Sequence, residues 1–322
     1  KNYVVKMNAD QLLIMQGVNA LKEKKLIEAE KIFKSSIQIN PFNVEANHFL
    51  GITFQLLNKM EEAIAKYKET IKIKPDFAEA HFSLGNIFYI LGKINKAEPY
   101  CKTAIQLEPN LTKATSLLNI ILEQKKVLSK IKDPGVSLAN KKVSGTRLDS
   151  NPFITMREVE TELVSSLYKM KSIELNKTGD VRYGNGKCSP DLKLFENNLS
   201  IIKTLKKDLT NIMVKAVKSE IYVGESFFNI LSTGSGTTAH RHLDPFDKAY
   251  KITDQKYSLV YYLSVGDQSC SDPGILKLFD PDEEILPTKG SIVITPASRK
   301  HSAVYNGKID RIMIGVNFYS LI

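Results

Sequence analysis

The 322-residue chain contains no tryptophan, only five histidines and only three cysteines, Cys101, Cys188 and Cys270. This odd number of widely spaced cysteines excludes a disulfide framework, and no Cys-x-x-Cys pair indicates a zinc site. We therefore expect reduced thiols and a cytoplasmic protein. The sequence also lacks the roughly 18 consecutive apolar residues of a membrane span. Since Lys1 to Asp10 contains no apolar stretch typical of a secretory signal, we expect no membrane partner.

The chain has an excess of positive charge but no basic block. It carries 45 Lys and Arg against 35 Asp and Glu, a net charge of +10. The lysines are spread along the sequence, whereas a nucleic-acid-binding domain usually has an Arg-rich stripe interleaved with aromatic residues. We therefore expect no nucleic-acid partner. With 43% hydrophobic and 25% charged residues, the composition predicts a folded globular protein, and the length favours two domains.

Three series of residues recur every 34 positions in the first third of the chain. They are Gly17, Gly51 and Gly85; Ala29, Ala63 and Ala97; and Pro41, Pro75 and Pro109. This period is that of the tetratricopeptide repeat, whose two helices meet closely at small residues and whose second helix is followed by proline. The region 1–131 therefore resembles an all-α tetratricopeptide solenoid. Its repeats are expected at about 10–43, 44–77 and 78–111, followed by a capping helix from Leu111 to Lys130.

Grooves of such repeats bind extended or helical peptides. The positions expected to line the groove here are mostly apolar or neutral: Ile14, Val18, Leu21, His48, Ile52, Gln55, Phe82, Asn86 and Tyr89. The Lys and Asn set with which some family members clamp a carboxylate tail is absent, so we do not expect a chaperone-tail adaptor. Packing between repeats is an equal alternative for Phe82 and Tyr89, and we expect His48 to be a packing or surface residue.

The sequence pattern changes after the repeats. Residues 132–152 contain Pro, Gly, Ser and Asn without hydrophobic periodicity and are predicted to form a linker. Two helices are predicted at about 155–172 and 190–218, joined by a glycine-rich loop. From Ser219 onward, short β-type runs are separated by turn residues: IYVG, FFNILS, YSLVYYLSV, GILKLF, GSIVIT, SAVYN and RIMIGVNFYSL. The chain is therefore predicted to be an α+β multidomain protein that ends in a β-sandwich or barrel with supporting helices.

Candidate metal ligands lie in this strand-rich region. In TTAHRHLDPF, His240, His242 and Asp244 are two residues apart, so in an extended segment their side chains project to one side. A further histidine, His301, begins another strand. Two imidazoles and one carboxylate form the facial triad of non-haem Fe(II) oxygenases. His240 has the parity to replace Asp244 in a three-histidine site, although a supporting role or none is preferred, and His242 with Asp244 could instead form a turn.

Arg311 lies in an apolar run ten residues after His301, where a guanidinium is costly to bury without an anion. It suggests a bound carboxylate, although pairing with Asp310 or another surface acid is the alternative.

Five ordered segments carry a family resemblance: HLD, LVYYLS, GILKLFDP, GSIVITPASRKH and DRIMIGVNF. Over about 220–322 they resemble the 2-oxoglutarate- and Fe(II)-dependent dioxygenases, and among these the prolyl hydroxylase group. The resemblance implies a dioxygenase domain over 153–322 with a double-stranded β-helix, or jelly-roll, fold. In this domain the helices at about 155–218 support a β-helix core at about 219–322.

The resemblance also implies roles for individual residues. It assigns His242, Asp244 and His301 to iron as the catalytic centre. Arg311 and Tyr262 are assigned to the distal carboxylate of 2-oxoglutarate, and Val260 to the wall of the same pocket; the family's other pocket tyrosine falls near Ser232 here. The implied cofactors are Fe(II), 2-oxoglutarate as co-substrate and O₂, with ascorbate as a further candidate.

Three functions are consistent with this sequence. The favoured one is hydroxylation of a protein or peptide, with proline as the candidate residue and the repeats recruiting the substrate or a partner. The second is a non-catalytic interaction scaffold with a degenerate oxygenase domain. The third is a 2-oxoglutarate oxygenase that acts on a small molecule.

Overall fold

The computed structural model describes residues 9–132 and 151–321. The chain folds into two compact units, a repeat unit up to Lys125 and a sheet unit from Lys126 onward. The division falls within helix α7 (Thr112–Lys132). Of the predicted linker, residues 133–150 lie outside the described part of the chain. None of the helices described is both long and apolar enough to cross a membrane.

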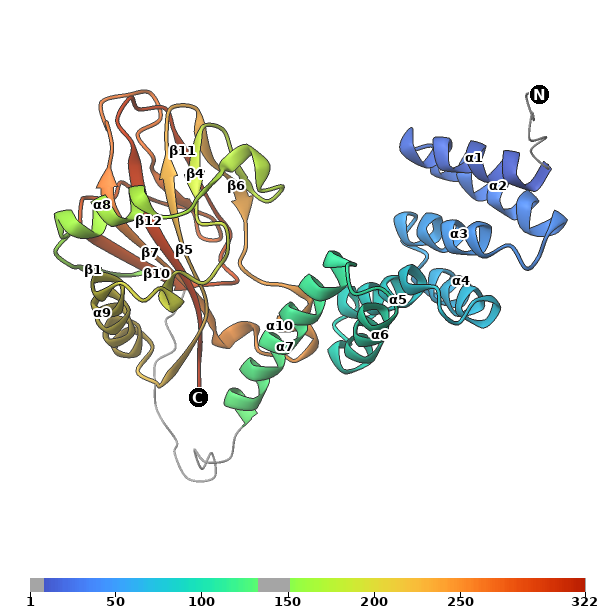
Figure 1. The fold of residues 1–322 in the computed structure, drawn as a ribbon. Coiled ribbons are helices and arrows are strands. Elements are labelled where there is room, and N and C mark those ends of the chain that lie inside the picture. The colour runs from blue at the N-terminus through green and yellow to red at the C-terminus, as the bar shows by residue number, and fades with distance from the viewer. Residues whose placement is uncertain (1–8, 133–150, 322) are drawn as a thin grey trace. The chain divides into compact units, whose positions relative to one another are not determined.

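The repeat unit is built from consecutive pairs of helices (Figure 1). These are α1 (Ala9–Lys22) with α2 (Leu26–Ile39), α3 (Val44–Leu56) with α4 (Met60–Ile73), and α5 (Ala78–Ile90) with α6 (Ile94–Leu107). Each pair occupies one predicted repeat, and α7 follows the third as the predicted capping helix. The prediction of an N-terminal helical repeat region is confirmed.

The 34-residue period has a direct packing cause. A Cβ atom placed on Gly51 would lie 2.6 Å from the ring of Tyr67, and one on Gly85 would lie 2.7 Å from Sγ of Cys101. Such distances are well below van der Waals contact, so a larger residue would push the two helices of the repeat apart. Gly17 makes the equivalent approach in the first repeat. The repeated alanines, Ala29, Ala63 and Ala97, are fully buried.

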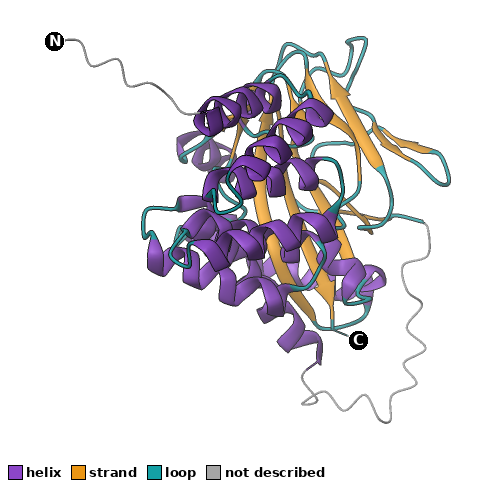
Figure 2. Cartoon of the chain, turned by 90° about the vertical axis from the view of Figure 1, so that its right-hand side faces the viewer, coloured by secondary structure: helices purple, strands orange, loops and turns teal. Residues whose placement is uncertain are grey.

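The sheet unit contains two antiparallel sheets, whose long strands run side by side in Figure 2. The larger has the order β1 (Phe153–Met156), β10 (Ser291–Pro296), β7 (Lys256–Val265), β12 (Arg311–Ser320), β5 (Ile221–Leu231), β4 (Gly186–Cys188) and β2 (Ile173–Glu174). The smaller has the order β3 (Arg182–Tyr183), β6 (Ser235–His240), β11 (His301–Tyr305), β8 (Leu276–Leu278) and β9 (Glu283–Ile285). From β5 to β12 the chain alternates between the sheets, except at the β8–β9 hairpin.

Helices α8 (Thr161–Lys169) and α9 (Ser200–Val217) belong to the core of the sheet unit. Their apolar residues share one buried cluster with side chains of β7, β10 and β12. In β7, Leu259 and Tyr261 join this cluster, whereas Val260 and Tyr262 face the opposite side of the sheet. This alternation is the period of two expected for a strand.

The structure corrects four expected elements. The helix predicted at about 190–218 begins only at Ser200, and the residues before it include a short 3-10 helix, Leu194–Glu196. The helix predicted at about 155–172 begins only at Thr161, because residues 153–156 alternate in burial and pair with β10. The glycine-rich segment predicted as a loop contains the short strands β3 and β4. The runs IYVG and FFNILS, predicted as two strands, form the single strand β5.

Candidate metal centre

A cavity of about 270 Å³ is lined by strands of both sheets and carries the candidate site. On the larger sheet, three rows of side chains in register face the cavity. They are Ser258, Asn317 and Glu225; Val260, Gly315 and Phe227; and Tyr262, Met313 and Asn229. The first row is polar and the second is apolar.

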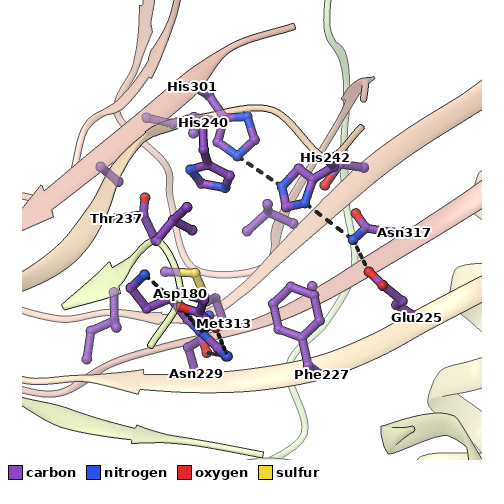
Figure 3. Close-up of a pocket in the computed structure, with 18 of the residues that line it drawn as sticks. Asp180, Glu225, Phe227, Asn229, Thr237, His240, His242, His301, Met313 and Asn317 are labelled. Atoms are coloured by element: carbon purple, nitrogen blue, oxygen red, sulfur yellow. Dashed lines mark hydrogen bonds and ion pairs between the residues drawn. The ribbon is translucent and has the colours of Figure 1, made fainter. Parts of the chain in front are cut away.

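Three histidines meet beside the first row. His240 ends β6, His301 begins β11, and these two residues are paired in register. His242 follows two residues after His240, and its Nε2 lies 3.2 Å from Nε2 of His301. Within the described residues, these three form the one group of His, Cys, Asp or Glu side chains suited to a metal, with one nitrogen of each within 4.8 Å of the others. Figure 3 shows the three rings turned toward one another.

The electrostatics favour neutral imidazoles at His242 and His301. Burial, with a contribution from His301 and His240, holds the pKa of His242 well below its usual value. Burial also lowers the pKa of His301 to about 4, again with a contribution from His240. A neutral imidazole has a free lone pair on one ring nitrogen, so both residues have the protonation state that metal binding requires.

Asp244 lies outside this group of nitrogens. It is the N-cap of helix α10 (Pro245–Ala249), and its Oδ1 accepts a hydrogen bond of 3.1 Å from the backbone N–H of Asp247. Its Oδ2 lies 3.5 Å from Nζ of Lys256. Burial raises the pKa of Asp244, and Lys256 acts in the opposite direction. Its assignment to iron stays a prediction.

Arg311 begins β12 and is fully buried. Its Nη1 donates to the carbonyl of Pro273 at 3.2 Å, and its Cζ lies 4.9 Å from the centre of the Tyr262 ring. Its Nε and Nη2 have no hydrogen-bond partner in the part of the chain that the structure describes. Burial lowers the pKa of this guanidinium. Asp310 instead accepts hydrogen bonds from Ser232 and Tyr168.

The predicted pocket residues Val260 and Tyr262 line the cavity, whereas Arg311 does not line it but packs against Tyr262. The structure also adds a residue that the sequence did not indicate. Arg182 of β3 lines the cavity, and its Nη1 donates to Oδ1 of Asn229 at 3.1 Å. Asp180 binds the same guanidinium, and Figure 3 shows Asp180 and Asn229 across the cavity from the histidines. In the sequence, the only indication of strand β3 was the alternation of polar and apolar residues in the short segment DVRY.

Comparison with known proteins identifies the repeats. Two family models match, one described as "TPR repeat" at residues 54–92 and one as "Tetratricopeptide repeat" at residues 78–111. The N-terminal region of the chain therefore contains tetratricopeptide repeats. No curated protein matches the sequence.

Solved structures are similar to part of this chain. A mutant O-GlcNAc transferase of Thermobaculum terrenum is 23% identical over 37% of this chain and 24% of its own, with a TM-score of 0.35. This chain therefore spans about a quarter of that transferase. The first TPR of Spaghetti (RPAP3), bound to an HSP90 peptide, is 20% identical over 40% of this chain and 99% of its own, with a TM-score of 0.36. The chaperone SycD of Yersinia enterocolitica is 20% identical over 38% of this chain and 92% of its own, with a TM-score of 0.35.

Proposed function

We propose that the sheet unit is an Fe(II)- and 2-oxoglutarate-dependent dioxygenase. One observation carries the proposal: His242 and His301, 59 residues apart in the sequence, place their Nε2 atoms 3.2 Å apart at a cavity lined by both sheets. Two neutral imidazoles at this distance, one half-buried and one buried, are suited to share one metal ion. The same two histidines carry the family resemblance in the sequence.

The strand order supports a double-stranded β-helix. In the larger sheet β10, β7, β12 and β5 are neighbours, and in the smaller sheet β6, β11, β8 and β9 are neighbours. Eight strands that alternate between two facing sheets, with one hairpin at the turning point, are typical of a jelly roll. In this arrangement the end of β6 and the start of β11 lie side by side, which brings the histidines together.

The donor set fits iron, for which imidazole is a suitable ligand. Fe(II), 2-oxoglutarate and O₂, with ascorbate as a reductant, would supply an oxidant able to hydroxylate an unactivated C–H bond. The protein's own contribution is to hold the imidazoles convergent and to line part of the cavity with apolar side chains. The side chains Val260, Phe227 and Met313 form part of that wall.

Arg311 supports 2-oxoglutarate as the co-substrate. Two nitrogens of its fully buried guanidinium, Nε and Nη2, have no hydrogen-bond partner in the described structure, and buried donor groups of this kind are costly unless an anion binds. A carboxylate could accept hydrogen bonds from both groups. Tyr262 packs against the guanidinium and lines the same cavity as the three histidines.

The repeats support a protein or peptide as the primary substrate, because tetratricopeptide grooves bind peptides. Proline is the first residue to test, given the resemblance to prolyl hydroxylases, and a small-molecule substrate is the alternative. The three cysteines are all free, which favours the cytoplasm as the compartment.

Turnover of 2-oxoglutarate to succinate tests the proposal. With Fe(II) in air, the protein should produce succinate, and His242→Ala should abolish this activity. Arg311→Ala should raise the 2-oxoglutarate concentration needed for half-maximal turnover more than about tenfold, because a buried charge-assisted contact is lost, and Arg311→Lys should recover part of the effect. Wild-type rates of succinate formation in both alanine variants would refute the proposal that the protein is this enzyme.

A second experiment searches for the substrate. Mass spectrometry of lysate proteins incubated with the enzyme should reveal the target as a peptide that gains one oxygen atom.

A non-catalytic scaffold is the second candidate, and the matched repeats at residues 54–111 favour it. This function requires protein binding without succinate formation. A wild-type protein that binds Fe(II) but never consumes 2-oxoglutarate, with or without lysate, would support the scaffold over the enzyme.

A further inference from the structure

We propose that Glu225 binds a cationic side chain, lysine or arginine, of the peptide substrate. The inference rests on the proposed dioxygenase, because it specifies which substrate the cavity of that enzyme accepts. Glu225 belongs to β5 and ends the polar row formed with Ser258 and Asn317, beside which the three histidines meet.

Asn317 fixes the position of the Glu225 carboxylate next to the candidate metal centre. Nδ2 of Asn317 donates to Oε2 of Glu225 at 2.5 Å and lies 3.3 Å from Nδ1 of His242. Figure 3 shows the amide of Asn317 between the imidazole and the carboxylate. One amide group therefore separates Glu225 from His242, so a side chain bound by this carboxylate lies close to the proposed reaction centre.

The charges that line the cavity leave Glu225 without a counter-ion. Nε of Arg182 donates to Oδ2 of Asp180 at 3.0 Å, and Arg241 lies 3.7 Å from Asp280. Among the Asp, Glu, Lys and Arg side chains that line the cavity, only Glu225 has no ion pair in the described part of the chain. Glu225 is half-buried, and a partly desolvated carboxylate is stabilised when an ammonium or guanidinium group binds to it.

The polar row has hydrogen-bond acceptors that the protein itself does not satisfy. Asn317 is 3% exposed, and its Oδ1 has no hydrogen-bond partner among the described residues. Oε1 of Glu225 likewise accepts no hydrogen bond from the residues that the structure describes, since Asn317 binds only Oε2. Ammonium and guanidinium groups carry several donors and no acceptor. The row is therefore complementary to a cation and not to a carboxylate or a phosphate.

The neighbouring row is suited to the apolar stem of such a side chain. Val260, Gly315 and Phe227 lie in register on the same face of the sheet, next to the polar row. The ring of Phe227 covers Gly315, where an added Cβ atom would overlap it. Lysine and arginine carry their charge at the end of a chain of methylene groups, which packs on apolar surfaces. With the charged end at Glu225, the methylene groups can pack against Phe227.

This contact predicts a basic residue in the substrate, beside the residue that is hydroxylated. Neighbouring residues of an extended peptide are only about 3.3 Å apart, so a peptide with proline next to lysine or arginine satisfies both proposals. The chain carries a net charge of +10, which gives no long-range attraction for a basic peptide. A preference for basic peptides would therefore have to come from a local contact such as that with Glu225.

The test compares three peptides, acetyl-Gly-Ala-X-Pro-Ala-Gly-amide, in which X is lysine, arginine or norleucine. Norleucine has an unbranched apolar stem without a charge. Dissociation constants for the full chain are measured by ligand-observed NMR, which requires no turnover, and succinate formation is measured separately. Glu225→Gln removes the charge with little change in shape, and Glu225→Asp keeps the charge. Glu220→Gln is the control, because Glu220 is an exposed acid directly before β5.

In the wild type and in Glu220→Gln, the tighter-binding basic peptide should bind at least about tenfold more tightly than the norleucine peptide, as one charge-assisted contact allows. Glu225→Gln should reduce this ratio to about threefold or less, and Glu225→Asp should recover part of it. Equal affinities in the wild type, or a preference that persists in Glu225→Gln, would overturn the inference, while succinate formation would leave the dioxygenase proposal intact. A preference that depends on Glu225 in a protein that never forms succinate would support the cation site and refute the dioxygenase.

Discussion

Burial and a lowered pKa do not by themselves identify a histidine as a metal ligand, as a comparison of His48 and His301 shows. Burial lowers the pKa of each to about 4. However, Nε2 of His48 lies 3.1 Å from Oγ of Ser83, and its ring packs edge-on against Phe77 with centres 5.2 Å apart. Nε2 of His301 instead faces another imidazole at a cavity. His48 is therefore a packing residue of the repeats, one of the two roles expected for it.

The buried His48 should make the repeats sensitive to acid. Its pKa is about 4 in the folded chain and about 6.5 when unfolded, so its contribution to stability is complete above pH 6.5 and is lost as the pH falls toward 4. Between pH 7.5 and pH 5 the loss is about 2 kcal/mol. Urea unfolding followed by helical circular dichroism should show this extra loss in the wild type but not in His48→Gln. Parallel pH profiles of the two proteins would contradict it.

At the scale of elements, the local periodicity of the sequence was sufficient to predict the repeat helices but not the short strands. The small residues that make the repeat helices approach one another are regularly spaced in the sequence, so their packing could be predicted. In contrast, β3 and β4 have only two or three residues and depend on pairing with β6 and β5, which are distant in sequence. Without knowing that pairing, the glycines around Arg182 favoured a loop. For the same reason the role of Arg182 in the cavity could not be predicted.

Arg157 connects three elements of the sheet unit, and its loss should destabilise that unit. It follows β1, is 8% exposed, and its guanidinium pairs with Glu160 before α8 and with Asp208 in α9. It also donates to the hydroxyl of Tyr261 in β7 at 3.1 Å. Arg157→Gln should lower the free energy of unfolding by about 1–3 kcal/mol, a value reduced because both carboxylates are partly exposed.

Differential scanning calorimetry of the full chain measures this change. Arg241→Gln provides the control, because that arginine is half-exposed and its nearest acid, Asp280, lies 3.7 Å away with 83% of its side chain exposed. The control should change stability by less than about 0.5 kcal/mol. Equal effects of the two substitutions would show that the Arg157 network contributes no more than a surface pair.

At the scale of the whole molecule, the sequence predicted a helical repeat region followed by a sheet-rich region, and both are present. Of the predicted ligands, His242 and His301 meet, although 59 residues separate them. The proximity of His240 depends on the register between β6 and β11, and the capping role of Asp244 depends on Lys256 and Asp247. Neither register nor capping partners can be determined from residue spacing, so the sequence could not show that His240 lies beside His301 or that Asp244 caps α10.

The presence of two compact units, each with its own core, predicts that substrate recruitment and chemistry can be separated. Gly51→Leu should disrupt the repeats, because even a Cβ atom there would lie 2.6 Å from the ring of Tyr67. Ala65→Leu adds a similar side chain at an exposed position of α4 and is the control.

We expect both variants to keep the wild-type conversion of 2-oxoglutarate without added protein. If the repeats recruit the substrate, only Gly51→Leu should lose oxygen transfer to lysate proteins, measured by mass spectrometry. Unchanged oxygen transfer in Gly51→Leu, together with circular dichroism showing loss of repeat helix, would exclude recruitment by the repeats and favour a small-molecule substrate.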